Sequence, residues 1–239
     1  MDILAADWPA PSFVHAFTTL KTEYQDFGQH QNSNLTSNTD ALIKKYHLPS
    51  TPVWLKQVHQ TNCHCLDANG SSKPTADASY THKRGKVCAI LTADCLPIFM
   101  TNTKGTFVAA IHGGWRSLAG GIVRQVIGRL NENPSDLLVW LGPAIGPNAF
   151  EVGEDVYQQF KVQTKGEQIV TEAFQPTLPG KWLVNIFSIA KIQLQSEGIL
   201  SHHIFGGGLC TYTQVDSFYS YRRSQDTGRM ASLIWMDPP

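Results

Sequence analysis

Three apolar segments of this chain each lead into a side chain that can bind a metal ion, and this repeated pattern limits how the chain can fold. The segments and the residues that follow them are 53–58 with His59, 87–91 with Thr92 and Cys95, and 106–111 with His112. All three segments are rich in residues that favour β-strands, and the ends of strands in one sheet lie close together. Two imidazoles and one thiolate, with a fourth position open, form a ligand set suited to catalytic zinc. We therefore expect a sheet-based fold in which His59, Cys95 and His112 converge.

The composition excludes several classes of function. The chain has 239 residues, of which 42% are hydrophobic, so it can form a full core. Its 19 basic and 19 acidic residues cancel, which leaves no net field to attract nucleic acid or an anionic membrane. The apolar runs are too short to span a bilayer, and residues 1–7 lack the basic start of a signal peptide. Five cysteines are an odd and sparse number for a disulfide framework, so we expect a cytoplasmic protein with free thiols.

The periodicity of apolar residues and the turn signals favour one mixed α+β domain over residues 1–239. Strands are predicted at residues 13–19, 53–58, 87–91, 96–100, 106–111, 137–141, 203–205, 218–221 and 230–235. Helices are predicted from a cap at Asn38 or Thr39 to before Pro49, across Leu118 to Leu130, at residues 154–162, and from a cap at Asn185 to Gly198. We expect residues 20–38 to form a long loop, 69–72 a turn, and 163–181 an irregular segment.

Other interpretations of the ligand cluster stay open on the residues alone. Cys95 with a neighbouring histidine could act as a thiol nucleophile and its base, as in a cysteine hydrolase. The same two imidazoles and thiolate also suit copper. A histidine beside a strand is most often structural. Asp94, next to Cys95, could orient a ligand histidine or could cap the backbone of a turn.

The sequence Cys63-His64-Cys65 looks like a second metal site but lacks the usual spacing of one. On a strand, alternation would place the two cysteines on one face and His64 on the other. Zinc-binding pairs usually have two or more residues between the ligands. We therefore predict that Cys63 and Cys65 are small packing residues that catalysis does not need.

Glycines and arginines near the end of the chain suggest further contacts with a ligand. The three glycines at 206–208 allow either a tight bend or the close approach of a ligand to the backbone. They match neither a P-loop nor a dinucleotide fingerprint, so they do not predict nucleotide binding. Arg116, Arg222 and Arg223 are candidate clamps for an anion, because a guanidinium group donates paired hydrogen bonds.

The longer motifs of the chain resemble those of the YfiH/laccase-domain family, whose members are also described as multifunctional purine nucleoside phosphorylases. The resemblance covers nearly the whole chain, and its strongest parts are Lys56-Gln57-Val58-His59, Thr92-Ala93-Asp94-Cys95-Leu96-Pro97 and His112-Gly113-Gly114-Trp115-Arg116. Supporting parts include Ala76-Asp77-Ala78, residues 141–147, Cys210-Thr211-Tyr212, residues 218–223 and Thr227-Gly228-Arg229-Met230. The resemblance implies a layered αββα sandwich with mixed β-sheets. It also implies that His59, Cys95 and His112 bind one Zn²⁺ ion.

The resemblance further implies an enzyme that cleaves adenosine and inosine with phosphate and also deaminates adenosine, with methylthioadenosine as a further substrate. Its partners would be nucleosides and phosphate, and it would be a monomer or a homodimer. His59, Cys95 and His112 would be catalytic as metal ligands, and Arg116, Asp94 and Gln57 would bind the substrate. The alternatives are a Cu²⁺-dependent polyphenol oxidase, a hydrolase that edits peptidoglycan precursors, and a metal-binding or partner-binding module without turnover. Nine histidines are few for several copper centres.

The chain departs from the family pattern near its start. The family usually has Thr-Thr-Arg followed by a pair of glycines, whereas Thr18-Thr19 is followed here by Leu20-Lys21. Lys21 can offer a point charge but not the two-pronged hydrogen bonding of arginine. We therefore expect Arg116, four residues after His112, to contribute a larger share of phosphate binding.

Overall fold

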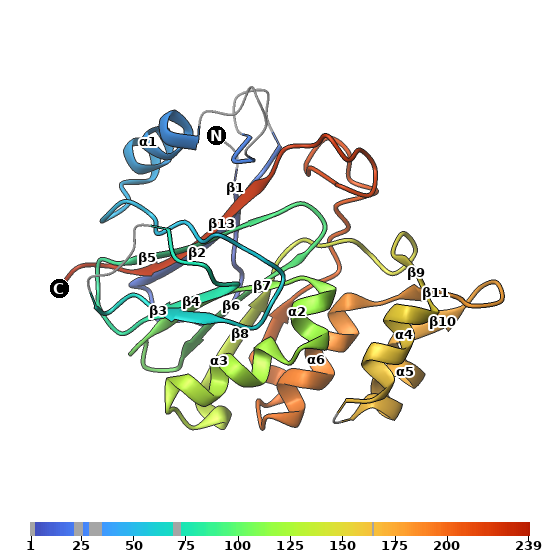
Figure 1. Cartoon of the computed structure of the whole chain (residues 1–239). Coiled ribbons are helices and arrows are strands. Elements are labelled where there is room, and N and C mark those ends of the chain that lie inside the picture. Colours follow the sequence, from blue (N-terminus) through green and yellow to red (C-terminus); the bar gives the residue numbers. More distant parts are fainter. Residues whose placement is uncertain (1–2, 22–25, 29–34, 69–72, 164) are drawn as a thin grey trace.

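Two β-sheets face each other at the centre of the computed structural model, and helices cover their outer faces (Figure 1). The structure describes residues 3–21, 26–28, 35–68, 73–163 and 165–239. The helices are α1 (Leu35–Tyr46), α2 (Trp115–Ala119), α3 (Ile122–Leu130), α4 (Glu154–Lys161), α5 (Gly166–Ala173) and α6 (Ile186–Ser196), with 3₁₀ turns η1 (Pro134–Asp136) and η2 (Ser201–His203). The strands are β1 (Ile3–Ala5), β2 (Val14–Thr19), β3 (Cys63–Cys65), β4 (Ala78–Thr81), β5 (Val87–Thr92), β6 (Leu96–Asn102), β7 (Val108–Gly113), β8 (Leu137–Leu141), β9 (Glu151–Gly153), β10 (Phe174–Pro176), β11 (Lys181–Val184), β12 (Ile204–Gly206) and β13 (Met230–Met236).

The larger central sheet places two of the candidate ligands at one end. Its strand order is β12-β8-β6-β7-β4-β3, with parallel pairs at both edges and antiparallel pairs between them. β6 and β7 pair so that Pro97 lies opposite His112. Because Cys95 directly precedes β6, this register brings it to the same end of the sheet as His112.

The other two sheets are antiparallel throughout. The smaller central sheet has the order β1-β2-β13-β5, so it joins the two ends of the chain to its middle. A third sheet of order β10-β11-β9 lies at the periphery beside α4 and α5 (Figure 1). Neither of these sheets contains a candidate ligand.

Buried clusters fill the three spaces between the layers. Leu42 of α1 packs with Phe17 of the smaller central sheet. Between the two central sheets, Phe99 stacks on Trp140 with ring centroids 5.6 Å apart. On the outer face of the larger sheet, α3 buries its apolar residues Ile122, Val123, Val126, Ile127 and Leu130. The resulting order of helix, sheet, sheet and helix confirms the predicted αββα fold, with mixed pairing in the larger sheet.

The helices predicted at residues 154–162 and after the cap Asn185 form as α4 and α6. The side-chain oxygen of Asn185 accepts hydrogen bonds from the backbone N–H groups of Phe187 (3.1 Å) and Ser188 (3.2 Å) at the start of α6. Gly198 follows α6 in a left-handed conformation, with φ of +93°. Phe160 of α4 points into the core. Among the described residues, no helix is long and apolar enough to cross a membrane.

The strand predicted at residues 53–58 does not form, although the predicted strands that lead to Cys95 and His112 do form. Val53 makes an isolated bridge to Cys88 of the smaller central sheet, and Lys56 makes one to Thr75 just before β4 of the larger sheet. The segment therefore crosses from one sheet to the other, and neither sheet offers it a continuous ladder of partners. His59 is consequently placed by an irregular segment rather than by a strand end.

The single helix predicted across Leu118 to Leu130 is in fact two helices. α2 ends at Ala119 and α3 begins at Ile122, and between them Gly121 has a φ of +83°. This left-handed conformation suits glycine and interrupts a right-handed helix. The break separates the short helix that follows His112 from the longer one that packs on the sheet.

Two segments near the C-terminus also differ from the prediction. Residues 163–181 are not irregular, because α5, β10 and the start of β11 form there. Residues 218–220 are irregular and Tyr221 begins a turn, so the predicted strand does not form. The Arg223 guanidinium donates hydrogen bonds to the carbonyls of Thr211 (2.9 Å), Tyr212 (2.8 Å) and Phe218 (2.6 Å), which folds this segment back on itself.

Two further elements in the N-terminal part differ from the prediction. α1 begins at Leu35, before the predicted cap at Asn38 or Thr39, and the Thr39 hydroxyl donates to the Leu35 carbonyl within the helix. β4 forms within the polar stretch 73–86, for which no strand was predicted. Of the predicted loop at 20–38 and the predicted turn at 69–72, residues 22–25, 29–34 and 69–72 lie outside the described residues.

Candidate metal centre

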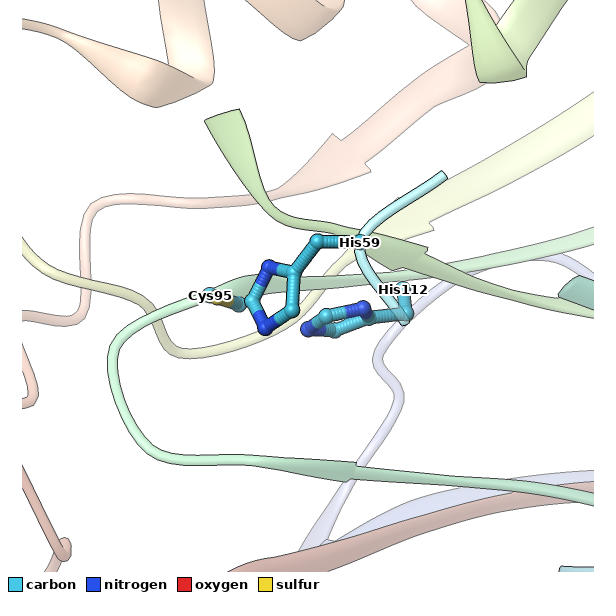
Figure 2. Close-up of side chains that lie close together, drawn as sticks. All are labelled: His59, Cys95 and His112. Atoms are coloured by element: carbon cyan, nitrogen blue, oxygen red, sulfur yellow. The ribbon is translucent and has the colours of Figure 1, made fainter. Parts of the chain in front are cut away.

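The three predicted ligands meet at one point, where their side chains lie together (Figure 2). One ligand atom from each of His59, Cys95 and His112 lies within 4.8 Å of the others. The two imidazole rings meet edge to face with centroids 4.7 Å apart. His59 is exposed, Cys95 is half-buried, and His112 is only 3% exposed. The site is thus closed on the sheet side and open toward His59.

His112 is held from behind by a buried carboxylate. Its ring Nδ1 lies 2.9 Å from Oδ1 of Asp77, which is fully buried. With Asp77 as acceptor, Nδ1 carries a proton and Nε2 is free to bind a metal ion. Burial lowers the pKa of His112, but the Cys95 thiolate and Asp77 outweigh it and raise the pKa to about 9. In the metal-free protein His112 therefore also carries a proton on Nε2 at neutral pH, and a metal ion would displace that Nε2 proton while Nδ1 keeps its own.

His59 is held by its backbone rather than by its ring. It has a φ of +57°, which is uncommon for a residue other than glycine. Its backbone N–H donates to Asp77 Oδ1 (2.9 Å), and that of Gln60 donates to Asp77 Oδ2 (2.8 Å). Burial and the positive charge of His112 lower the pKa of His59. The His59 ring is therefore held neutral, as a metal ligand requires.

Asp77 is the main residue of the site that was not predicted as a candidate from the sequence. Although burial raises its pKa, hydrogen bonds from His112 and from the backbone hold the pKa of Asp77 below its usual value. The prediction that Asp94 orients a histidine is wrong, because Asp77 has that position. The only signal in the sequence was the motif Ala76-Asp77-Ala78, an acid between two small apolar residues.

Asp94 lies in the turn before Cys95 and contacts the C-terminal part of the chain. Its Oδ1 accepts a hydrogen bond from the Thr211 hydroxyl (2.6 Å), and its Oδ2 accepts one from the backbone N–H of Arg222 (2.7 Å). The turn-capping interpretation of Asp94 is therefore the one that its contacts support.

Gly114 lies against all three candidate ligands, and only the absence of its side chain leaves the centre open. A Cβ atom at Gly114 would lie 2.9 Å from His59 Nδ1, 3.3 Å from Cys95 Sγ and 3.4 Å from His112 Cε1. Its φ of −66° is accessible to any residue, so backbone conformation does not explain the glycine. The three donors around this gap fit a metal ion that binds imidazole and thiolate.

The residues predicted to bind substrate differ in how free their side chains are. The Gln57 amide pairs with the backbone of Leu91 through two hydrogen bonds of 2.8 Å. Arg116 is exposed in the first turn of α2, with its guanidinium 4.2 Å from the centre of the Trp115 ring. The guanidinium group of Arg116 donates no hydrogen bond within the described ranges, so its donors are available to an anion.

The other basic candidates are bound to their own chain. Arg222 donates to the carbonyls of Ala149 (3.2 Å) and Glu151 (3.0 Å), and Arg223 braces the C-terminal turns. The Lys21 ammonium donates to the Val215 carbonyl at 3.1 Å. These contacts indicate structural roles, which leaves Arg116 as the stronger candidate for binding phosphate.

The two remaining motifs lie outside the ligand cluster. Cys63 is buried in the core beside the helices and Cys65 is half-buried, so neither belongs to the cluster. The glycines at 206–208 all have positive φ, from +70° to +89°, and form a tight bend. They also line a cavity of about 460 Å³ that Cys210 and the first turns of α6 complete.

Both the sequence and the fold of this chain have counterparts among known proteins. The family described as "Multi-copper polyphenol oxidoreductase laccase" matches residues 17–237, and this chain belongs to that family. A Haemophilus influenzae protein named purine nucleoside phosphorylase is 40% identical over 99% of this chain and 100% of its own length. An Escherichia coli protein named purine nucleoside phosphorylase YfiH is 39% identical over 98% of each chain. The predicted resemblance to the YfiH proteins is thus confirmed.

Solved structures with this fold cover almost the whole chain. A Neisseria meningitidis protein is 37% identical and superposes with a TM-score of 0.88, over 99% of this chain and 100% of that one. The YlmD protein of Geobacillus stearothermophilus is 25% identical with a TM-score of 0.84, over 95% of this chain and 93% of that one. These structures support the layered αββα architecture independently of the sequence motifs.

Proposed function

We propose that this chain is a zinc-dependent purine nucleoside phosphorylase acting on adenosine, inosine and methylthioadenosine, with adenosine deaminase activity. The observation that carries the proposal is the convergence of His59, Cys95 and His112 around the gap at Gly114. Relatives named purine nucleoside phosphorylase are 39–40% identical along the full length, which supports the nucleoside substrate. The five cysteines are free thiols, which fits the cytoplasmic location that we propose with this activity. A monomer or a homodimer would serve it equally.

We favour zinc over copper because the structure offers one metal centre among the described residues. Multicopper oxidation requires several copper sites, each with its own ligands. In the part of the chain that the structure describes, His59, Cys95 and His112 form the only cluster of three or more histidine, cysteine or acidic residues that could hold a metal ion. One such cluster with an open position suits a Lewis acid better than a chain of electron carriers.

The proposed chemistry divides between the metal centre and Arg116. When bound, zinc would supply a Lewis acid that lowers the pKa of water to about 7, which suits deamination. Asp77 would keep Nε2 of His112 free as a ligand, and Arg116 would bind phosphate through its unpaired donors. In phosphorolysis a phosphate oxygen bonds to the ribose C1′ while the bond from C1′ to the purine breaks, and the purine leaves with a proton. Deamination replaces the adenine amino group with oxygen from water, releases that group as ammonia, and needs no phosphate.

The proposal is tested by assaying inosine and adenosine with and without phosphate. We expect phosphate-dependent release of hypoxanthine from inosine, and phosphate-independent conversion of adenosine to inosine. Substituting Arg116→Ala should raise the phosphate KM about ten- to a hundredfold, as expected for loss of a charge-assisted hydrogen bond worth roughly 1.5–3 kcal/mol, and should change deamination much less. Arg124→Ala, on the exposed side of α3, is the matched control.

The alternatives predict different results in the same assays. Oxygen-dependent oxidation of phenols without nucleoside cleavage would favour the copper oxidase. Turnover of peptidoglycan precursors alone would favour the editing hydrolase. Metal binding without turnover of any of these substrates would favour a binding module. Each of these three results would contradict the proposed phosphorylase.

A further inference from the structure

Asp94 has an unusual backbone conformation directly beside the thiolate ligand. Its φ is +91°, in the left-handed half of conformational space that residues with a side chain rarely occupy. It is 9% exposed, and its backbone carbonyl accepts a hydrogen bond from the Ile145 N–H at 2.9 Å. Such a conformation persists only where the surroundings hold it. The direction in which the chain leaves Asp94 decides where the Cys95 side chain points.

The groups that hold the Asp94 carboxylate are themselves fixed. Thr211, which donates to Oδ1 at 2.6 Å, is fully buried, and its backbone N–H is bound to the Ala144 carbonyl at 2.9 Å. Arg222, which donates its backbone N–H to Oδ2 at 2.7 Å, has its guanidinium bound to the carbonyls of Ala149 and Glu151. Both carboxylate oxygens of Asp94 therefore contact a braced C-terminal segment, residues 211–222, that is distant in sequence.

We propose that Asp94 is a positioning residue for Cys95: it holds the left-handed turn that directs the thiolate toward His59 and His112, and so makes metal affinity depend on the segment 211–222. The inference rests on the proposed metal site. It assigns Asp94 a different role from substrate binding, because both of its carboxylate oxygens already accept hydrogen bonds from Thr211 and Arg222.

The proposal is tested by measuring zinc affinity, by competition with a chelator, and the thiolate-to-cobalt charge-transfer absorption of the Co²⁺-loaded protein. Asp94→Ala should lower zinc affinity about ten- to a hundredfold, the range seen when partners of metal ligands are removed, and should weaken the charge-transfer band. Asp94→Gly should lose less affinity than Asp94→Ala, because glycine adopts a positive φ without strain.

The conservative variant should restore most of the affinity. In Asp94→Asn the amide oxygen can accept from the Arg222 N–H while the amide nitrogen donates to the Thr211 hydroxyl, and asparagine tolerates the left-handed conformation. Thr211→Val removes one contact and should give a smaller loss of affinity than Asp94→Ala. Asn131→Ala is the matched control, since Asn131 has a φ of +53° at the end of α3, away from the centre. It should reduce thermal stability and leave zinc affinity unchanged.

Three results separate failure of this inference from failure of the proposed function. If the wild-type protein binds zinc, and Asp94→Ala binds it equally tightly with an unchanged cobalt spectrum, Asp94 does not position Cys95. If Asp94→Ala does not fold, wild-type affinity and an unchanged cobalt spectrum in both Asp94→Gly and Thr211→Val would overturn the inference in the same way. If the wild-type protein binds no zinc, the proposed metal site itself is wrong.

Discussion

His112 and His59 reach the same centre from two different kinds of structure. His112 lies in β7, a strand paired on both sides, and its position follows from the register with β6. His59 lies in an irregular segment between the two central sheets, is exposed, and has a left-handed backbone. Asp77 joins the two by bonding the ring of His112 and the backbone N–H of His59. The comparison indicates that strand register places the backbone of His112, whereas the backbone of His59, outside the sheet, needs a hydrogen bond to Asp77.

The largest difference between the two histidines should be in the stability of the metal-free protein. His112→Ala leaves a cavity in the buried side of the site and should lower the free energy of unfolding by roughly 2–4 kcal/mol, by analogy with other large-to-small core changes. His59→Asn, at an exposed position and with a residue that tolerates the left-handed conformation, should change it by less than about 0.5 kcal/mol. Denaturant unfolding after chelation measures both. Equal losses of unfolding free energy in the two variants would contradict the distinction between a ligand in a strand and a ligand in an irregular segment.

Gly114 tests whether His59 and His112 must bind the metal in the space that the missing side chain leaves open. Overpacking by one methyl group costs roughly 1–3 kcal/mol, so Gly114→Ala should lower zinc affinity by about 5- to 150-fold while the backbone remains unstrained. Gly128→Ala is the matched control, because a Cβ at Gly128 in α3 meets no atom within 4 Å. Isothermal titration with zinc measures both variants. An unchanged affinity in Gly114→Ala would mean that the metal binds elsewhere.

Substitution of Asp77 tests the residue that bonds both the ring of His112 and the backbone of His59. Asp77→Asn keeps the size of the side chain but replaces one acceptor oxygen with a donor, so it cannot accept all of the hydrogen bonds from His112, His59 and Gln60. We expect zinc affinity to fall about tenfold, at the lower end of the range for such partners. Asp67→Asn is the control, because Asp67 bonds Nδ1 of His82 at 2.9 Å outside the cluster. Equal zinc affinities in the two variants would contradict the role given to Asp77.

The last difference is one of direction rather than size, and it concerns the pH dependence of stability in the metal-free protein. The pKa of His112 is raised to about 9, so its contribution to stability is complete below the unfolded value near 6.5 and is lost as pH rises through about 9. The pKa of His59 is lowered, so its contribution is present above about 6.5 and is lost as pH falls through its folded pKa. Unfolding curves of His112→Gln and His59→Gln, each subtracted from wild type, should slope in opposite directions. Parallel difference curves would be inconsistent with the two environments.

The same comparison explains what the sequence could predict. His112 and Cys95 were predictable because a hairpin of two apolar strands brings its ends together by local rules. His59 was placed correctly at the centre but for a wrong reason, since residues 53–58 do not form a strand. Asp77 could not be assigned by periodicity, because its hydrogen bond to His112 joins residues 35 positions apart.

The missed elements have a related cause. Residues 218–221 have the composition of a strand, but Arg223 binds the carbonyls of Thr211 and Phe218 and folds the segment back on itself instead. β4 contains Ser79 and Thr81, polar residues that are fully buried; both pair with β7, and Ser79 also pairs with β3. Local patterns identify where apolar strands end, and they do not identify polar groups whose partners come from elsewhere in the chain.

The most direct test of the central claim is the zinc content of the purified protein, measured by elemental analysis for wild type, Cys95→Ala and Cys63→Ala. If His59, Cys95 and His112 bind the metal, wild type and Cys63→Ala should each hold one zinc ion per chain, and Cys95→Ala should hold almost none. Cys63 is the matched control because it is a buried cysteine outside the cluster. Full zinc in Cys95→Ala, loss of zinc in Cys63→Ala, or stoichiometric copper in the wild-type protein would contradict the assignment.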